Sequence, residues 1–306
     1  MSGKPLINIS SPQLERVELA LLSQRGIRLS VLRLDQIHPS INGNKWFKLK
    51  LNIDAIRESD KNRVLSFGGA WSNHLVALAS AGKVFGFNTI AVIRGELPEQ
   101  SNPVLDYLRQ QGMRLHSVSR SEYRQRNDAQ FLTSLNDRFG DFYHLPEGGS
   151  NELAVAGCRE IASYLQWQGG EGKQLLAAAC GTGATLAGII LGLESQRQWQ
   201  TRVLGVSVLK APGYMARQVN YWLQRLGSNG KIRWSISDDY HCGGYARSNA
   251  ELRGFLACAS SQCAVPLEPV YSGKLGYALS RELGRGAIEP GTEVIAIHSG
   301  GLPLES

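Results

Sequence analysis

Two lysines, Lys45 and Lys48, stand three positions apart directly after a strong turn signal at residues 39–44. If a helix begins at this turn, both amines lie on one face of it, near its positive end. An ammonium group is disfavoured there, so the pKa of the amine falls and the amine becomes a better nucleophile for forming a Schiff base. Two solvated surface lysines would give the same residues, and this segment alone favours that simpler interpretation.

Three kinds of polar side chain gather after the glycine pair Gly68 and Gly69. Ser72, Asn73 and His74 place a hydroxyl, an amide and an imidazole at the start of a predicted helix, where Ser72 or Asn73 is a natural N-cap. The glycines allow backbone N–H groups to converge on an anion such as a carboxylate. Because a cap alone does not require such a dense polar cluster, the segment favours a binding site over a purely structural role.

A loop of small residues lies between an apolar strand and an apolar helix farther along the chain. It consists of Gly181, Thr182, Gly183, Ala184 and Thr185. Small residues permit close backbone approach and the helix start supplies aligned N–H donors, as in a phosphate-binding loop. The segment lacks the Gly-Lys-Ser/Thr of a Walker loop, and its third glycine falls too late for the dinucleotide fingerprint. It therefore favours a phosphate that is not part of a nucleotide, although many turns in α/β proteins contain Gly-Thr-Gly.

Other glycine-containing turns occur at residues 147–151, 240–245, 269–274 and 298–301. Each of them, taken alone, has a turn or a helix cap as its simpler explanation. Together they place glycine-containing loops at the ends of predicted strands, which is where ligands bind in open α/β sheets.

The elements that must position these residues alternate between strand and helix. Apolar runs that suit buried strands occur at residues 64–67, 88–93, 114–118, 175–179, 203–207 and 294–297, and helical patterns at 73–85 and 102–111. This alternation predicts an α/β protein with open parallel sheets covered by helices. Residues 88–145 read as a compact, charge-rich unit between glycine clusters. We therefore predict a large domain from residues 1–49 and 156–306, and a small inserted domain from residues 50–155, with a cleft between them.

Composition restricts the class of protein. The chain has 306 residues, of which 42% are hydrophobic, enough for a sizeable core. The formal charge of +7 favours a mildly basic surface over a nucleic-acid partner, because no Lys/Arg run occurs. The five cysteines form no Cys-x-x-Cys pair, so we expect no disulfide framework, no metal site and a reducing compartment. Without a signal-peptide pattern or an apolar run of about 18 residues, the sequence predicts a soluble cytoplasmic protein.

In this order, the segments resemble the D-cysteine desulfhydrase / 1-aminocyclopropane-1-carboxylate (ACC) deaminase family of enzymes that use pyridoxal 5'-phosphate (PLP). The most specific motifs are GNKWFKL at residues 43–49, GGAWSNH at 68–74 and PVYSGK at 269–274, supported by EGGSN at 147–151 and HSGG at 298–301. The resemblance covers residues 30–303. It implies the tryptophan-synthase-β fold, or fold type II of PLP enzymes, with PLP in the cleft, a small amino-acid substrate and a homodimer.

The resemblance also assigns roles to individual residues. Lys45 matches the lysine that carries PLP as a Schiff base, and Lys48 matches a basic residue near the phosphate. Residues 181–185 match the phosphate loop, and Asn73 matches an asparagine that hydrogen-bonds the ring hydroxyl. Ser272 occupies the position that faces the pyridine nitrogen. The expected catalytic residues are Lys45, Ser72 and Tyr271, and the expected substrate contacts are Ser72, Asn73, His74 and Tyr240.

Two positions favour one activity within this family. ACC deaminases carry Glu where this chain has Ser272, and tend to carry Gln where it has His74. A carboxylate keeps the pyridine nitrogen protonated and the ring a strong electron sink, which opening the ACC ring needs more than β-elimination does. We therefore predict a deaminating lyase that converts D-cysteine to pyruvate, sulfide and ammonia, with Lys45 as the base at Cα.

Other interpretations stay open. An ACC deaminase would give 2-oxobutyrate and ammonia, and a non-catalytic PLP-binding protein is less favoured than either enzyme. Trp71 and Trp46 depart from the family pattern, so the sequence alone does not identify the substrate or its stereoisomer.

Overall fold

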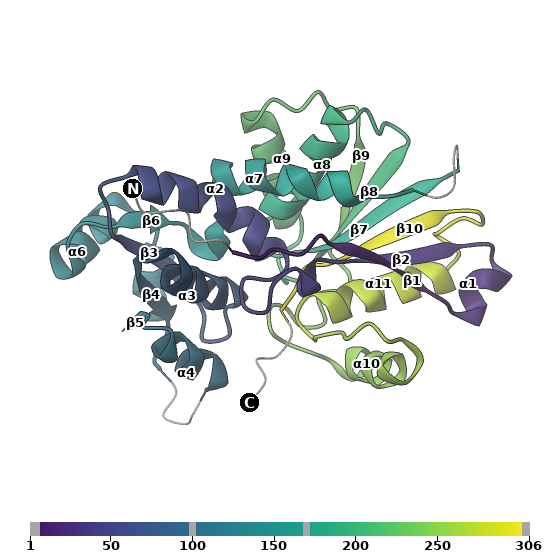
Figure 1. Cartoon of the computed structure of the whole chain (residues 1–306). Coiled ribbons are helices and arrows are strands. Elements are labelled where there is room, and N and C mark those ends of the chain that lie inside the picture. The colour runs from purple at the N-terminus through teal and green to yellow at the C-terminus, as the bar shows by residue number, and fades with distance from the viewer. Residues whose placement is uncertain (1–6, 98–101, 168–171, 302–306) are drawn as a thin grey trace.

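The computed structural model describes residues 7–97, 102–167 and 172–301 (Figure 1). Its strands form a six-stranded sheet in the order β1-β2-β10-β7-β8-β9 and a four-stranded sheet in the order β5-β4-β3-β6. The six-stranded sheet contains β1 (Gln13–Val17), β2 (Arg28–Arg33), β7 (Gln174–Cys180), β8 (Thr201–Ser207), β9 (Arg233–Ser237) and β10 (Glu293–His298). The four-stranded sheet contains β3 (Arg63–Gly68), β4 (Asn88–Arg94), β5 (Arg114–Val118) and β6 (Tyr143–Leu145). Neighbouring strands are parallel except β1 and β2, which confirms the predicted α/β class.

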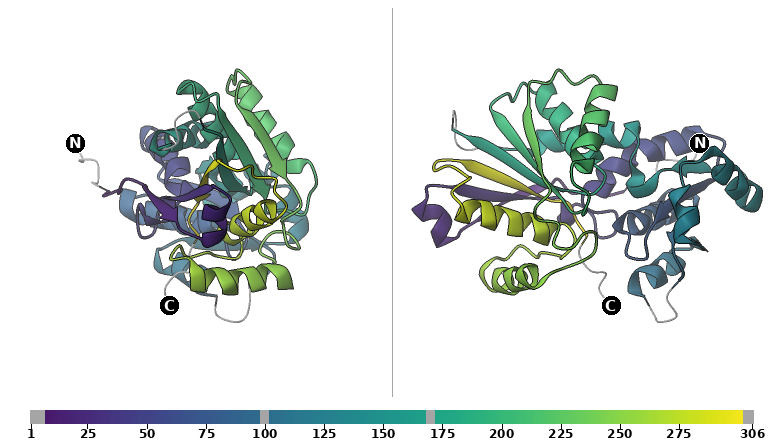
Figure 2. Two further views of the ribbon diagram at one scale, coloured as in Figure 1. Left: turned by 90° about the vertical axis from the view of Figure 1, so that its right-hand side faces the viewer. Right: turned by 180° about the vertical axis from the view of Figure 1, so that it is seen from behind.

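Helices cover both faces of the larger sheet (Figures 1 and 2). The helices are α1 (Ala20–Gln24), α2 (Asn44–Glu58), α3 (Asn73–Phe85), α4 (Pro103–Gln110), α5 (Arg120–Arg124), α6 (Ala129–Phe139), α7 (Glu152–Cys158), α8 (Ala184–Ser195), α9 (Tyr214–Arg225), α10 (Ala250–Gln262) and α11 (Ser272–Gly284). Along β7, Leu176 and Ala178 belong to the core with α8 and α9, whereas Ala177 and Ala179 belong to the core with α11. A strand buried on both faces shows this alternation, because successive side chains point to opposite sides of a sheet.

The smaller sheet also has two covered faces. On β3, Val64 packs into the core that contains residues of α2, α3 and α4. The next residues of the strand that face the other way, Leu65 and Phe67, pack with Tyr123 of α5 and Phe139 of α6. Each sheet is therefore covered by helices on both faces. In such α/β units, ligands bind at the carboxyl ends of the strands.

The predicted strands and helices are all present, with ends that differ by one or two residues. Four strands were not predicted, because they carry no continuous apolar run: β1, β2, β6 and β9. A compact unit that begins at residue 88 is wrong, since β3 pairs with both β4 and β6 in one sheet. The finer domain limits at residues 49/50 and 155/156 remain a prediction. Within the described ranges, no helix has both the length and the apolar character needed to cross a membrane.

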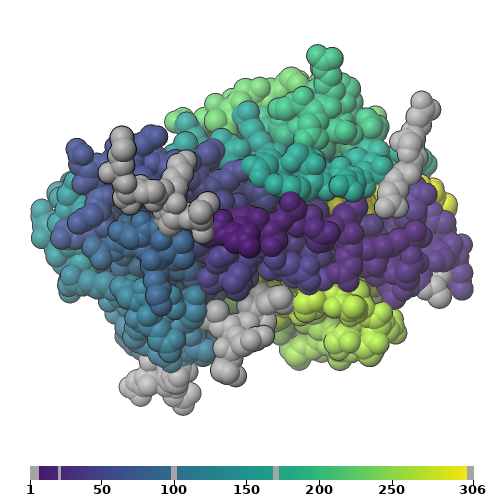
Figure 3. All heavy atoms as spheres, viewed as in Figure 1, coloured from purple at the N-terminus to yellow at the C-terminus, as the bar shows by residue number. Residues whose placement is uncertain are grey.

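Two close approaches fix the loops that surround the start of α2. A Cβ on Gly43, whose φ is +66°, would lie 2.0 Å from Ser299 O, so the lysine-bearing turn lies directly against the loop after β10. A Cβ on Gly301 would lie 2.4 Å from Asn73 Nδ2, so the same loop also meets the start of α3. In Figure 3 the purple part of the chain, near its N-terminus, runs across the face of the molecule between teal atoms above and yellow-green atoms below.

Candidate active site

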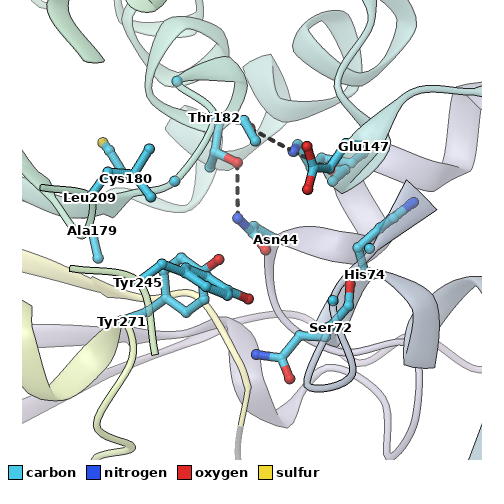
Figure 4. Close-up of a pocket in the computed structure, with 18 of the residues that line it drawn as sticks. Asn44, Ser72, His74, Glu147, Ala179, Cys180, Thr182, Leu209, Tyr245 and Tyr271 are labelled. Atoms are coloured by element: carbon cyan, nitrogen blue, oxygen red, sulfur yellow. Dashed lines mark hydrogen bonds between the residues drawn. The ribbon is translucent and has the colours of Figure 1, made fainter. Parts of the chain in front are cut away.

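A cavity of about 360 Å³ lies where the carboxyl ends of strands from both sheets meet (Figure 4). Its wall contains the loops after β3, β7 and β8 and the first turn of α2. The predicted site residues that line it are Lys45, Lys48, Ser72, Asn73, His74, Gly181, Thr182, Gly183, Thr185 and Tyr271. A volume of this size is in the range of sites that hold small ligands and cofactors.

Lys45 lies in the first turn of α2 and lines the cavity. Its Nζ donates a hydrogen bond to Asn44 Oδ1 at 2.6 Å and lies 5.8 Å from the ring centroid of Tyr271. Asn44 Nδ2 donates in turn to Thr185 Oγ1 at 2.9 Å, which connects the lysine to the loop after β7. Burial lowers the pKa of Lys45 from 10.5 to about 8. Near neutral pH a fraction of Lys45 is therefore the unprotonated amine, the form that acts as a nucleophile or base.

Lys48 lies one turn farther along α2 and is only 3% exposed. Its Nζ donates to Gly148 O at 2.6 Å, to Ser150 Oγ at 2.8 Å and to Thr182 Oγ1 at 3.3 Å. Burial, followed by the like charge of Lys45, lowers the pKa of Lys48 to about 7. These neighbours are all neutral oxygens, so a bound anion would supply the opposite charge that a buried ammonium needs.

The start of α8 completes an anion-binding cradle beside Lys48. The N-cap of this helix is Gly183, with φ +78° and no side-chain cap, so the first N–H groups of α8 have no side-chain acceptor. A helix start of this kind binds phosphate well, because the N–H groups and the helix dipole both favour an anion. The buried amine of Lys48, the hydroxyls of Ser150 and Thr182 and this helix start therefore fit the phosphate group of a cofactor.

The start of α3 contributes a second set of polar groups. Ser72 is the N-cap, and its Oγ accepts a hydrogen bond from Leu75 N at 3.3 Å. The Nε2 of His74 lies 2.8 Å from Ser66 Oγ, while its Nδ1 has no hydrogen-bond partner in the described part of the chain. Burial and the charges of the two lysines hold the pKa of His74 well below 6.5, so the ring is neutral. Its buried, unpartnered nitrogen lies close to Gly149, where a Cβ would stand 3.1 Å from it.

Two tyrosines lie side by side in the cavity wall, Tyr271 and Tyr245 (Figure 4). Their rings meet edge to face, with centroids 6.1 Å apart. The hydroxyl of Tyr271 would lie 3.1 Å from a Cβ on Gly181, so it approaches the loop after β7. Burial raises the pKa of both phenols, and both therefore remain protonated donors.

Tyr245 is a site residue that the sequence reasoning missed. The aromatic and glycine cluster at residues 240–245 was a signal, but the residue chosen from it, Tyr240, lies outside the cavity wall. Tyr240 is buried, its hydroxyl donates to Glu282, and it accepts a hydrogen bond from Arg285 at 3.1 Å. Tyr245, and not Tyr240, therefore lines the cavity, and a substrate contact at Tyr240 stays a prediction.

Two predicted cofactor residues also lie outside the wall. Ala184 is the first residue of α8 and is buried in the core. Ser272 is buried as well, and its Oγ accepts a hydrogen bond from Glu268 N at 2.9 Å. The neighbour of Ser272 in the chain, Tyr271, is the residue that lines the cavity, so a direct contact between Ser272 and the cofactor stays a prediction.

Three charged residues from β4 and from loops near the smaller sheet also line the cavity, where no prediction had placed them: Arg94, Arg126 and Glu147. Arg126 Nε pairs with Glu147 Oε2 at 2.8 Å, and the hydroxyl of Tyr123 donates to Glu147 Oε1 at 2.8 Å. Arg94, at the end of β4, is exposed and brings a guanidinium nitrogen to 3.7 Å from a Cβ on Gly69. A cation therefore stands beside the glycine loop that precedes α3.

Comparisons with known proteins agree with this arrangement. Residues 13–300 match the family model described as pyridoxal-phosphate dependent enzyme. The bifunctional D-cysteine desulfhydrase/1-aminocyclopropane-1-carboxylate deaminase, mitochondrial, of Arabidopsis thaliana is 29% identical over 300 residues, 90% of this chain and 73% of that protein. The D-cysteine desulfhydrase of Klebsiella pneumoniae (strain 342) is 25% identical over 293 residues, 91% of this chain and 88% of that protein. The crystal structure of an ACC deaminase homologue has a TM-score of 0.80 at 23% identity and covers 99% of this chain and 96% of that one, which shows a shared fold.

Proposed function

The chain belongs to the family of pyridoxal-phosphate-dependent enzymes, and from that premise we propose that it is a deaminating lyase that eliminates the β-substituent of a small amino acid, with D-cysteine as the first candidate. The observation that carries the proposal is the shared cavity. There the amine of Lys45, with its lowered pKa, the polar start of α3 and two protonated tyrosines surround one space. The relatives named D-cysteine desulfhydrase support this choice of substrate.

PLP, when bound, supplies the electron sink that stabilises negative charge at the α-carbon of the substrate. Lys45 would hold it covalently through its amine. Lys48, Ser150, Thr182 and the start of α8 would hold its phosphate, because an amine, two hydroxyls and the N–H groups of a helix start gather there. Asn73 would reach the ring hydroxyl, as its place at the start of α3 allows.

The start of α3 is suited to hold the substrate carboxylate. Gly68 and Gly69 have no side chains that would block an anion from the backbone, and the dipole of the helix favours an anion at this end. Ser72 uses its oxygen to accept the capping bond from Leu75 N, so its O–H remains free to donate to a ligand. The guanidinium of Arg94 adds a positive charge beside the same loop.

Lys45 and the tyrosines divide the proton transfers between them. The amine of Lys45, once free and neutral, can accept the proton from the α-carbon, because its lowered pKa leaves a base near physiological pH. Tyr271 and Tyr245 stay protonated and can donate to the departing sulfur. In the overall reaction D-cysteine and water give pyruvate, hydrogen sulfide and ammonia, which balances without a further reactant.

The surroundings of Ser272 support elimination over ring opening. The nearest carboxylate, that of Glu268, accepts hydrogen bonds from the backbone N–H groups of Val270, Tyr271 and Ser272 at 2.7, 2.6 and 2.7 Å. A carboxylate that already serves as the N-terminal acceptor of α11 is a poor partner for a pyridinium N–H. Ser272, at the position that the resemblance assigns to the pyridine nitrogen, would then offer a hydroxyl, which suits the weaker electron sink. ACC deaminase activity, giving 2-oxobutyrate, remains the second candidate because relatives of both names are similar to this chain.

We also propose an oligomeric state and a localisation: the protein acts as a homodimer in the cytoplasm. The family resemblance supports the dimer, and the free cysteines among the described residues, without a disulfide, suit a reducing compartment. Sedimentation at micromolar concentration would test the dimer.

The experiment that tests the function is sulfide release from D-cysteine by the purified, PLP-loaded protein, with L-cysteine alongside. We expect sulfide and equimolar pyruvate from the D-isomer alone. Lys45→Ala should abolish both the release and the visible absorbance band, whereas the matched control Lys83→Ala, at an exposed lysine on α3, should keep both. Formation of 2-oxobutyrate from ACC, with no sulfide from either isomer, would replace the proposal with the second candidate. Retention of band and turnover by Lys45→Ala would refute the assignment of the lysine itself.

A further inference from the structure

Besides Lys45 and Lys48, the protein buries another amine, that of Lys274, which the proposed reaction does not use. Lys274 lies in the first turn of α11 and is 0% exposed. A buried ammonium is unfavourable without a partner, and the positive end of a helix adds to the penalty. Burial accordingly lowers the pKa of Lys274. A lysine kept in such a place needs an explanation in what it contacts.

The amine of Lys274 donates its hydrogen bonds to main-chain carbonyl oxygens. Lys274 Nζ donates to Gly244 O at 2.7 Å and lies 3.5 Å from Val208 O. In the described part of the chain, no carboxylate forms a salt bridge with it. Val208 directly follows β8, and Gly244 lies in the loop between β9 and α10, so one side chain joins three segments that are far apart in the sequence.

The loop that Lys274 holds has a strained backbone. Cys242 and Ala246 have φ values of +50° and +53°, which non-glycine residues seldom adopt. Between them Gly243 and Gly244 have φ values of +100° and +110°. Strain of this kind persists only where the surrounding structure imposes it, and it often marks a functional segment.

The strained loop carries Tyr245 into the active site. Tyr245 stands between Gly244 and Ala246, and its ring meets Tyr271 in the cavity wall. Tyr271 is itself the residue before α11, three positions from Lys274. The amine therefore connects the two segments whose tyrosines must face each other.

The other end of the loop is tied to the same helix. Tyr240 donates to Glu282 near the end of α11 and accepts a hydrogen bond from Arg285 at 3.1 Å. Residues 240–246 are thus anchored to α11 at both ends, by Tyr240 at one and Lys274 at the other.

We infer that Lys274 is a positioning residue, an internal cation that draws carbonyl oxygens inward and holds the strained loop so that Tyr245 lies against Tyr271. Main-chain carbonyls can serve a buried ammonium because their dipoles present negative ends to it. The inference rests on the proposed function only for its kinetic consequence, since the position of the loop can be measured without substrate.

The test compares Lys274→Met with Lys210→Met. Lys210 is exposed and its Cβ packs 3.4 Å from where a Cβ on Gly244 would stand, so it touches the same loop without entering the core. Hydrogen exchange of residues 240–247, followed by mass spectrometry, should be faster by about tenfold or more in Lys274→Met and unchanged in Lys210→Met. Exchange in β7 and β10 should stay slow in both variants. Equal exchange of the loop in the two variants would overturn the inference.

A kinetic measurement separates positioning from general support of the fold. We expect Lys274→Met to lower kcat about tenfold or more, because Tyr245 is misplaced, while the Kd for PLP changes by less than about twofold. A matching loss of PLP affinity would show a general structural role and contradict the inference. If no amino acid proves to be a substrate, the proposed function fails, but the loop measurement still decides the role of Lys274.

Chemical rescue provides a second variant if Lys274→Met does not fold. Lys274→Ala leaves a space beside the two carbonyl oxygens, which a small alkylammonium ion can enter. Refolding in ethylammonium chloride should restore protection of residues 240–247, whereas tetramethylammonium chloride, which has the charge but no N–H donor, should not. Equal recovery in both salts, or recovery in neither, would overturn the role of a hydrogen-bonded cation.

Discussion

The lowered pKa of Lys45 makes a prediction whose size follows from the structure. Burial removes water from the ammonium and favours the neutral amine, so the pKa falls from 10.5 to about 8. At pH 7 an amine with a pKa of about 8 is neutral in roughly a tenth of the molecules, whereas at 10.5 the fraction is roughly one in three thousand. Lys45 should therefore react with electrophiles about 300-fold faster at pH 7 than its usual pKa would allow, for equal access.

Competitive labelling measures this directly in protein free of PLP. Trace isotopic acetic anhydride is added between pH 6 and pH 11, with N-acetyl-lysine amide in the same tube, and the label on each lysine is read by mass spectrometry after digestion. The amine is reactive above its pKa and protected below it, so labelling of Lys45 should rise through a midpoint near 8. The small amine should rise near 10.5, its usual value.

The cause of the shift can be tested in the same assay. Because burial is the largest cause, the midpoint for Lys45 should change little between low salt and about 1 M salt, which screens charge–charge effects. Lys48 should titrate lower, near 7, and Lys45→Met should raise its midpoint only in part, since burial again exceeds the like charge. A Lys45 midpoint at 10 or above would refute the reasoning from burial, and a strong dependence on salt would replace burial with charge repulsion.

Three further predictions concern other parts of the site. Gly43→Ala should lower the free energy of unfolding by more than about 2 kcal/mol, because the new Cβ meets Ser299 O, while Gly86→Ala, with the same sign of φ but open space, should lose only about 1 kcal/mol in a denaturant titration. Thr182→Val should weaken PLP binding about tenfold, because one hydroxyl of the cradle is lost, and unchanged affinity in a spectral titration would argue against the phosphate site. Tyr245→Phe should lower kcat at least about tenfold with an unchanged visible band, and full activity would remove Tyr245 from the reaction.

Much of the fold could be predicted because its signals are local. Continuous apolar runs mark the buried strands β3, β4, β7, β8 and β10. A parallel strand that helices cover on both faces buries nearly every side chain, so nearly every residue in it is apolar. β1 and β9 could not be found in this way, because an edge strand needs neither an apolar run nor a fixed alternation. Their place in the sheet is decided by the neighbour with which they pair.

The residues of the candidate site also fall into those that local sequence predicts and those that it does not. Lys45, Ser72 and Thr182 were predictable because each occupies a definite position in a local motif, at the start of a helix or in the loop before one. Tyr245 was not, because the choice between it and Tyr240 depends on a loop whose backbone is bent by contacts with α11. Residues five apart in an irregular loop carry no period from which the direction of a side chain follows.

The sequence by itself determined the family and predicted its chemistry: a reactive lysine, an anion-binding helix start and a loop fit for phosphate, in the order of one family of PLP enzymes. Only the tertiary structure decided the environment of these groups. It buries Lys45 and Lys48 and lowers their pKa values, and it encloses Lys274 among carbonyl oxygens. The physical reason is that bonding patterns along the chain are local, whereas desolvation and strain depend on which distant segments exclude water from a side chain and hold its backbone.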